Sequence, residues 1–233
     1  MKEIFNKLKN GLVVSCQAED ESPFNSPEGV MQFAKAVIMG GAIAIRSEGY
    51  EKIRLIKKNI DLPVIGLIKS EFEDGFVRIT GCENDVEKLL SLGCDIIAID
   101  GTFRIRENLS GPNFINKIKS KYDCLIMADI SNVEEAIACV DAGADCISTT
   151  LSGYTPETEF IKAIGADYKL VAELVNKLSC PIFAEGRVNS PVEAAKMIEL
   201  GVWSVVVGSA ITRPHLITSW FSDAIKNSIG KNK

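Results

Sequence analysis

Two stretches decide the fold of this chain: Pro181-Ile-Phe-Ala-Glu-Gly-Arg187 and Val205-Val-Val-Gly-Ser-Ala-Ile-Thr-Arg213. Each is a short apolar run that ends in glycine and polar residues and leads into a helical pattern. Such a run is typical of a buried parallel strand, and a glycine at its end lets the backbone approach a ligand closely. The helix start that follows offers N–H groups to an anion. Two such units near the end of the chain predict the phosphate site of a (β/α)8 barrel.

The same alternation of strand and helix runs through the whole sequence. Dividing 233 residues among eight units gives about 29 residues per unit, which suits one βα pair. This regular series predicts that residues 1–233 form one closed α/β barrel rather than an open sheet. A short helix is expected at 1–10 and a flexible tail at 230–233. The predicted strands are Leu12–Cys16, Ala42–Ile45, Val64–Ile68, Ile96–Asp100, Leu125–Asp129, Cys146–Thr150, Pro181–Ala184 and Ser204–Val207.

Local signals predict several helix boundaries. Ser26 with Pro27 should open the helix after the first strand, since serine caps helices and proline fits their first position. Capping boxes are predicted at 84–87, 131–134 and 190–193. Three glycines should end helices in the left-handed conformation, namely Gly93, Gly143 and Gly201.

Composition excludes several classes of protein. A net charge of −5 argues against a nucleic-acid binder, and no apolar run reaches the roughly 18 residues of a membrane span. The first ten residues lack the apolar core of a secretion signal. Seven scattered cysteines fit reduced thiols in the cytoplasm. With no Cys-x-x-Cys and a single histidine, His215, a zinc site of the Cys/His type is not expected.

A polar residue follows each predicted strand, and the active site of such a barrel lies at these carboxyl ends. Asp100 is the weakest candidate, because it can equally cap the loop at Gly101-Thr102. Cys16 has no histidine placed to activate it as a nucleophile. The strand-end candidates are Gln17, Arg46, Lys69, Asp100, Asp129, Thr149 with Thr150, Glu185 and Arg213.

Lys69 and Glu185 are the candidates for acid–base chemistry. A lysine can act as a base near neutral pH if burial or a nearby cation such as Arg46 lowers its pKa. The alternatives are a charged lysine paired with Asp129, or a Schiff-base lysine. Glu185 can exchange protons with a bound sugar phosphate, or it can orient its neighbours. Arg46 and Arg213 suit an anionic substrate, and they can also pair with the carboxylates.

Seven segments resemble, in order, those of the N-acetylmannosamine-6-phosphate 2-epimerase (NanE-type) family. One departure is Arg78-Ile-Thr-Gly-Cys82, where the family usually has Ile-Thr-Pro-Thr, so this loop should be looser. The segments are Gly11-Leu-Val-Val-Ser-Cys-Gln-Ala18, Gly41-Ala-Ile-Ala-Ile-Arg46, Pro63-Val-Ile-Gly-Leu-Ile-Lys69, Met127-Ala-Asp-Ile-Ser131, Ser148-Thr-Thr-Leu-Ser-Gly-Tyr-Thr155, Ala184-Glu-Gly-Arg187 and Gly208-Ser-Ala-Ile-Thr-Arg-Pro214.

The resemblance implies reversible epimerisation at C2 of N-acetylmannosamine 6-phosphate, in sialic acid catabolism, without a metal or cofactor. It assigns Lys69 as the C2 acid/base and Glu185 as its assistant. Two alternatives remain: a lyase or synthase on the same barrel, similar to thiamine-phosphate synthase, and a sugar-phosphate-binding protein without activity. A homodimer is a candidate assembly. The expected substrate contacts are Gln17, Arg46, Asp129 and Thr149, and the expected phosphate contacts are Gly186, Arg187, Gly208, Ser209 and Arg213.

Overall fold

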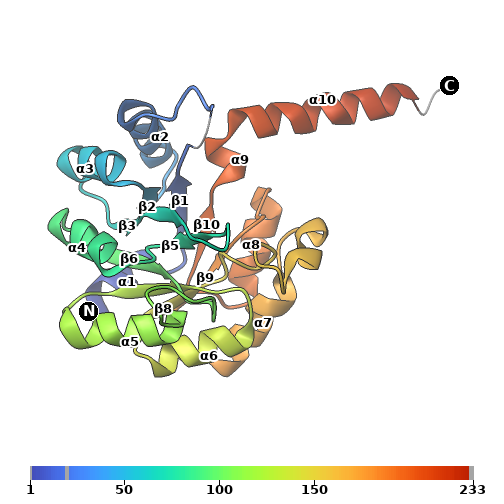
Figure 1. Ribbon diagram of the computed structural model, residues 1–233. Helices are drawn as coiled ribbons and strands as arrows, with labels where there is room; N and C mark the ends of the chain where they lie inside the picture. The colour runs from blue at the N-terminus through green and yellow to red at the C-terminus, as the bar shows by residue number, and fades with distance from the viewer. Residues whose placement is uncertain (1, 19–20, 231–233) are drawn as a thin grey trace.

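Eight parallel strands close into a barrel in the order β1-β10-β9-β8-β7-β6-β3-β2 (Figure 1). The computed structural model describes residues 2–18 and 21–230. The predicted (β/α)8 barrel is confirmed. Its strands are β1 Leu12–Cys16, β2 Ala44–Glu48, β3 Val64–Leu67, β6 Ile96–Asp100, β7 Ile126–Asp129, β8 Cys146–Ser148, β9 Ile182–Glu185 and β10 Ser204–Val207.

Helices follow the strands and cover the outside of the barrel (Figure 1). Ser26 caps its helix as predicted, accepting a hydrogen bond from the N–H of Gly29. Gly93, Gly143 and Gly201 have φ values of 67°, 99° and 93°, as expected for residues that end helices. The helices are α1 Lys2–Leu8, α2 Pro27–Met39, α3 Tyr50–Asn59, α4 Glu83–Ser91, α5 Gly111–Lys121, α6 Val133–Asp141, the 3-10 helix η1 Glu159–Ile164, α7 Tyr168–Lys177, α8 Pro191–Glu199, α9 Ser209–Thr212 and α10 Pro214–Gly230.

Two of the three predicted capping boxes are wrong in detail. The N-cap of α4 is Cys82, so Asn84 lies inside the first turn. For α6 the box is shifted by one residue: Asn132 accepts from the N–H of Glu135, whose carboxylate reaches back to Ser131. The third box is confirmed, because the Ser190 hydroxyl accepts from the N–H of Glu193.

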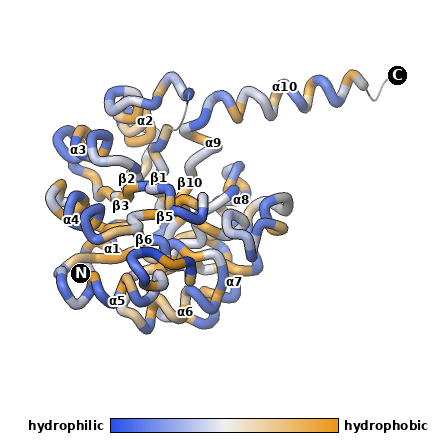
Figure 2. The backbone as a smooth tube through the Cα atoms, viewed as in Figure 1, coloured by the Kyte–Doolittle hydropathy of each residue, from blue (hydrophilic) through white to orange (hydrophobic). Residues whose placement is uncertain are grey.

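The barrel interior is an apolar core that closes the amino-terminal end. Side chains that point inward include Val13, Ile65, Met127 and Phe183, and they pack with Phe5 and Leu8 of α1. The indole N–H of Trp203 holds this helix in place by donating to the carbonyl of Phe5 at 2.7 Å. Figure 2 shows hydrophobic colour along barrel strands such as β3 and β6. Among the described residues, this packing fills the amino-terminal end of the barrel.

The second strand extends further than predicted and changes the position of Arg46. The prediction ended this strand at Ile45, whereas β2 runs to Glu48. Arg46 thus lies within the barrel wall, paired in register with Ser15 on one side and Ile65 on the other. A charged residue can occupy this buried place because its partners lie across the barrel, as described below.

A short antiparallel hairpin follows β3 and was not predicted. It consists of β4 Lys69–Glu71 and β5 Val77–Ile79. The Arg78–Cys82 segment that departs from the family pattern begins in β5. A Cβ atom on Gly81 would lie 2.6 Å from the Phe72 ring, so the glycine is closely packed in the folded chain. This packing describes the position of Gly81, and the expectation of a looser loop stays a prediction.

The last helix leaves the barrel instead of packing against it (Figure 1). Three of its apolar side chains, at spacings of four residues, are largely exposed: Phe221 at 69%, Ile225 at 61% and Ile229 at 62%. The tail was predicted to begin at residue 230, but Gly230 is the last residue of α10, and residues 231–233 lie outside the described part of the chain. Within residues 2–18 and 21–230, none of the helices combines the length and hydrophobicity of a membrane span.

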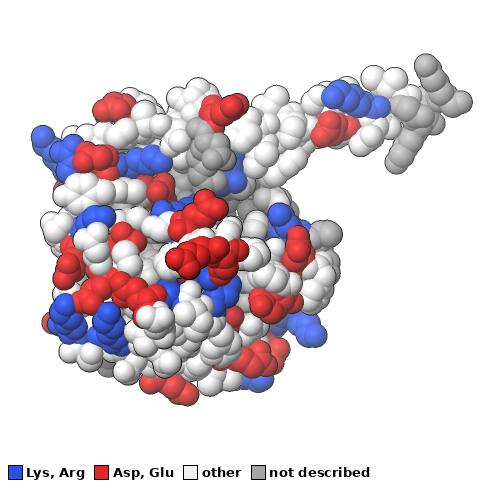
Figure 3. Space-filling model, in the orientation of Figure 1, with Lys and Arg blue, Asp and Glu red and all other residues white. Residues whose placement is uncertain are grey.

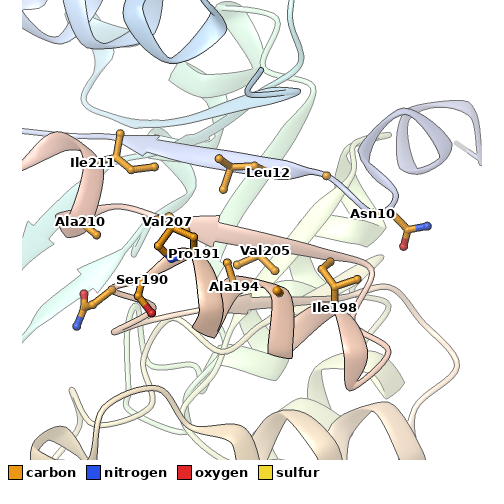
Figure 4. A pocket seen from close by; sticks show the side chains of 13 residues that line it. Asn10, Leu12, Ser190, Pro191, Ala194, Ile198, Val205, Val207, Ala210 and Ile211 are labelled. Atoms are coloured by element: carbon orange, nitrogen blue, oxygen red, sulfur yellow. The ribbon is translucent and has the colours of Figure 1, made fainter. Parts of the chain in front are cut away.

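An apolar groove remains on the outside of β1 and β10, next to α8 (Figure 4). Its volume is about 430 Å³. Leu12, Val205 and Val207 line it from the strands, and Ala194 and Ile198 line it from α8. Ala210 and Ile211 of α9 also line the groove. Within the described residues, the groove therefore leaves an apolar part of the barrel exterior open.

Candidate active site

A cavity of about 800 Å³ opens at the carboxyl ends of the strands. On the face seen in Figure 3, acidic and basic side chains are interspersed, and neither sign forms a broad patch. Most of the predicted site residues line this cavity, although they come from distant parts of the chain. They are Gln17, Arg46, Lys69, Glu185, Gly186, Arg187, Gly208, Ser209 and Arg213.

Arg46 forms the charged centre of the site. Its guanidinium donates to both carboxylate oxygens of Asp129, at 3.0 Å to Oδ1 and 2.6 Å to Oδ2. Its Nη1 also lies 3.3 Å from Oε2 of Glu185. A planar guanidinium matches a carboxylate in this two-point geometry, which fixes its orientation. Asp129 is fully buried beneath the cavity, so its role there is to orient the guanidinium of Arg46.

Burial and ion pairing act in opposite directions on this cluster. Burial would lower the pKa of Arg46, but the charges of Asp129 and Glu185 raise it above its ordinary value. Burial raises the pKa of Asp129 and of Glu185, while Arg46 partly opposes the rise. One guanidinium charge faces two carboxyl groups, and each carboxylate disfavours ionisation of the other. Glu185 therefore keeps its proton to higher pH than an ordinary glutamate.

Three hydroxyl groups at the end of β8 surround Glu185. Ser148 and Thr150 place their hydroxyl oxygens 3.2 and 3.0 Å from its Oε2. Thr149 instead holds the backbone of Glu185: its hydroxyl donates to the carbonyl at 2.8 Å and accepts from the N–H at 3.0 Å. The predicted contact Thr149 is thus turned away from the cavity, and its neighbour Thr150 lines the cavity. The sequence places two adjacent threonines at this strand end without showing which one faces inward.

Glycine residues shape the other side of the cavity. Gly186 and Arg187 both have positive φ values, of 102° and 57°, so the chain turns sharply after β9. The guanidinium of Arg187 donates to the backbone carbonyls of Ser152 and Gly165, so it braces loops rather than facing the cavity centre. Its backbone lies at the turn after β9, so the predicted phosphate contact of Arg187 stays a prediction. Arg213, at the end of α9, lines the cavity and supplies a cation there.

Lys69 lies across the cavity from these glycines, at the start of β4. Its side chain is half-buried, and the hairpin residues Phe76 and Val77 line the cavity beside it. Gln17 is buried and donates to the Ser15 hydroxyl at 2.8 Å. The amine of Lys69, the carboxyl group of Glu185 and the guanidinium groups of Arg46 and Arg213 therefore line the same cavity.

The weaker sequence candidates lie outside the cavity. Asp100 is fully buried and caps its loop, since it accepts from the N–H of Thr102 and pairs with Arg106. Burial raises the pKa of the Cys16 thiol to about 12, which leaves little thiolate to act as a nucleophile. His215 is exposed in the first turn of α10.

Sequence reasoning missed several residues of the cavity. Arg104 lines it and pairs with Asp100 at 2.7 Å. Lys162 and Trp220 also line it, from η1 and from α10. These residues come from loops and a helix rather than from strand ends, so the rule for barrel strands does not identify them. Among the described residues, no group of three or more His, Cys, Asp or Glu could hold a metal ion.

Comparisons with known proteins agree over nearly the whole chain. The family described as "NanE: Putative N-acetylmannosamine-6-phosphate epimerase" matches residues 30–227. Two proteins named "Putative N-acetylmannosamine-6-phosphate 2-epimerase" are similar to this chain. The one from Clostridioides difficile is 48% identical and covers 96% of this chain and 99% of its own. The protein from Pasteurella multocida is 42% identical, and the match covers 97% of this chain and 96% of that protein.

Solved structures show the same relationship. The N-acetylmannosamine-6-phosphate 2-epimerase from Clostridium perfringens has a TM-score of 0.89 at 41% identity, covering 95% of this chain and 96% of that chain. A thiamine phosphate pyrophosphorylase from Pyrococcus furiosus has a TM-score of 0.60 at 17% identity, covering 90% and 89%. The second similarity concerns the fold alone.

Proposed function

The chain belongs to the NanE family of N-acetylmannosamine-6-phosphate epimerases, and from this premise we propose that it interconverts N-acetylmannosamine 6-phosphate and N-acetylglucosamine 6-phosphate. It is then an isomerase that inverts C2. The observation that carries the proposal is that Lys69, Glu185 and Arg46 line one cavity whose rim includes Gly186 and Gly208.

In the proposed reaction a proton leaves C2 and returns to the opposite face. The open-chain sugar carries an aldehyde, which acidifies the neighbouring C2–H. The amine of Lys69 removes this proton, and the electron pair of the C–H bond moves into an enolate. Arg46 supplies positive charge where the negative charge develops on oxygen, in a buried environment that strengthens the interaction. Delivery of a proton to the other face of C2 regenerates the aldehyde with inverted configuration.

Glu185 is the second acid–base group in this proposal. Burial raises its pKa, so it keeps its proton to higher pH than an ordinary glutamate, and it can donate that proton to a ring or carbonyl oxygen and take it back later. The hydroxyls of Ser148 and Thr150 keep its carboxyl group in place. Asp129 positions Arg46 without touching the substrate.

The phosphate group is proposed to bind on the glycine side. The backbone turns at Gly186-Arg187 and Gly208-Ser209 line the cavity, and Arg213 adds a positive charge there. Backbone N–H groups at such turns are suited to an anion. This arrangement leaves C2 within the part of the cavity that Lys69 and Glu185 share.

A proton nuclear magnetic resonance assay in heavy water tests the proposal. With N-acetylmannosamine 6-phosphate, the C2 proton signal should disappear while the N-acetylglucosamine 6-phosphate signals grow. A lyase or synthase on the same barrel would cleave or join the sugar without C2 exchange. A binding protein would hold the sugar without changing it. Either of these results would overturn the proposed reaction.

The cellular setting follows from the same proposal. An enzyme for N-acetylmannosamine 6-phosphate fits amino-sugar catabolism in the cytoplasm, where sugar phosphates are retained. All seven cysteines are free thiols, which is typical of a reducing compartment. The net charge of −5 supports a small-molecule substrate rather than nucleic acid.

The proposed assembly is a homodimer in which the α10 helix of each copy covers the groove of the other. Phe221, Ile225 and Ile229 form an apolar stripe on a helix that its own barrel leaves uncovered. The apolar groove beside β1 and β10 is lined by Leu12, Val205 and Val207 (Figure 4). Burial of one such side chain contributes about 1.5–3 kcal/mol. A twofold arrangement buries two stripes, enough to offset an association cost of about 4–15 kcal/mol.

Sedimentation velocity tests this assembly. The full chain should sediment as a dimer, and Phe221→Glu with Ile225→Glu should shift it toward monomer because two charges would enter the groove. Lys226→Ala, on the same helix and outside the stripe, is the matched control and should remain dimeric. A monomeric full chain, or a dimer that both charges leave intact, would contradict the proposal.

A further inference from the structure

The hydroxyl of Thr150 has more polar neighbours than one proton can serve. Its Oγ1 lies 2.7 Å from Oδ1 of Asp129, 3.0 Å from Oε2 of Glu185 and 2.8 Å from the hydroxyl of Ser148. A hydroxyl donates one hydrogen bond and accepts up to two. If both carboxyl groups were ionised, Thr150 could donate to only one of them, and the other contact would lack a proton.

A proton on Glu185 completes this network. The carboxyl of Glu185 then donates to Thr150, and Thr150 donates to Asp129. Asp129 remains ionised, because it also receives both N–H groups of Arg46. When Glu185 gives up its proton, the Thr150 hydroxyl can turn and donate to Glu185 instead. The same atom therefore serves both protonation states of the glutamate.

We propose that Thr150 is a positioning residue that links the protonation state of Glu185 to the Arg46–Asp129 pair, so that Glu185 can act in turn as acid and base. This inference rests on the proposed function. The charged groups around Glu185 are Arg46 from β2 and Asp129 from β7, and Lys69 lines the same cavity from β4. Thr150 acts through Glu185 and needs no contact with the sugar.

The direction of the effect follows from the strength of the two hydrogen bonds. A bond donated to an ionised carboxylate is stronger than one between neutral groups. In the protonated form Thr150 donates to ionised Asp129 and also accepts from Glu185, whereas in the ionised form it donates to Glu185 alone. Removal of the hydroxyl therefore destabilises the protonated form of Glu185 more than the ionised form. The pKa of Glu185 should therefore fall by about one unit in Thr150→Val, which has a similar shape and no hydroxyl. Thr150→Ser keeps the hydroxyl and should keep the original pKa.

Carbon-13 nuclear magnetic resonance of enzyme labelled at the glutamate carboxyl carbon measures this shift without turnover. Glu185→Gln identifies the signal by its absence. We expect the Glu185 titration to move to lower pH in Thr150→Val and to return in Thr150→Ser. An unchanged titration in Thr150→Val, or a shift of the same size in Thr150→Ser, would overturn the proposal.

Kinetics then test the link to catalysis. In Thr150→Val the acid–base limb of the kcat profile should move in the same direction as the titration, with kcat roughly tenfold lower and KM little changed. Equal melting temperatures of the two variants would separate this effect from a general loss of structure. An inactive wild-type enzyme would refute the epimerase function, while the carbon-13 titration would still decide the role of Thr150.

Discussion

Replacement of Arg46 by methionine should destabilise the protein in a manner that depends on pH. The guanidinium is 1% exposed and is the cation paired with the two buried carboxyl groups of Asp129 and Glu185. Removing one partner of a buried ion pair costs about 3–5 kcal/mol. Since a domain of this size loses about 2–4 °C of melting temperature per kcal/mol, Arg46→Met should melt roughly 6–20 °C lower at about pH 8.

The sign of the pH effect follows from the two carboxyl groups. Their pKa values are already raised in the folded protein, and the loss of Arg46 would raise them further. A group with a higher pKa in the folded state favours folding at low pH, and this contribution is lost as the pH rises through the folded pKa. The deficit of Arg46→Met relative to wild type should therefore be smaller at about pH 5 than at about pH 8.

Urea unfolding followed by circular dichroism at both pH values measures the deficit. Arg54→Met is the matched control, because Arg54 pairs with Glu51 on the surface with both side chains more than half exposed. The control should change stability little at either pH. A deficit for Arg46→Met that is below about 1 kcal/mol, or equal at both pH values, would refute the account of a buried, charge-balanced centre.

Three further predictions concern the site. Lys69→Ala should abolish interconversion and C2 proton exchange while calorimetry still detects sugar-phosphate binding; normal turnover would refute its role as the base. Arg213→Ala should raise KM for the phosphorylated sugar about tenfold to a hundredfold, because a charged hydrogen bond is lost; an unchanged KM would remove Arg213 from the phosphate site. Cys16 should resist alkylation at neutral pH until the protein unfolds, as peptide mass spectrometry can show, because its thiol pKa is about 12; rapid labelling of the folded protein would contradict this.

The sequence was sufficient to predict the barrel because its periodic signals are local. Each strand is a short apolar run, and Gly93, Gly143 and Gly201 mark the turns that follow helices. Such signals depend on residues within one βα unit, so no knowledge of the rest of the fold is needed. Lys69 and Glu185 were correctly predicted to lie in one cavity, because each follows a strand whose position can be read from local signals.

Features that depend on distant contacts were not predictable. A charged residue suggests a strand end, yet Arg46 lies within β2 because Asp129, 83 positions away, neutralises it. Side chains that follow a short strand end need not keep its alternation, so the sequence did not show that Thr150 rather than Thr149 lines the cavity. The β4–β5 hairpin depends on pairing between two short polar segments. In the proposed dimer α10 packs on the groove of a second copy, which the pattern of a single chain does not indicate.

The position of α10 gives the proposed dimer a consequence for the enzyme in dilute solution. Leu216 and Trp220, near the start of this helix, line the cavity, whereas Phe221 and Ile225 belong to the stripe that a second copy would cover. Separation of the subunits would expose the C-terminal part of α10, while the N-terminal part of the same helix forms part of the cavity wall. By mass action, specific activity should therefore fall when the enzyme is diluted below its dimer dissociation constant, and saturating sugar phosphate should oppose the fall.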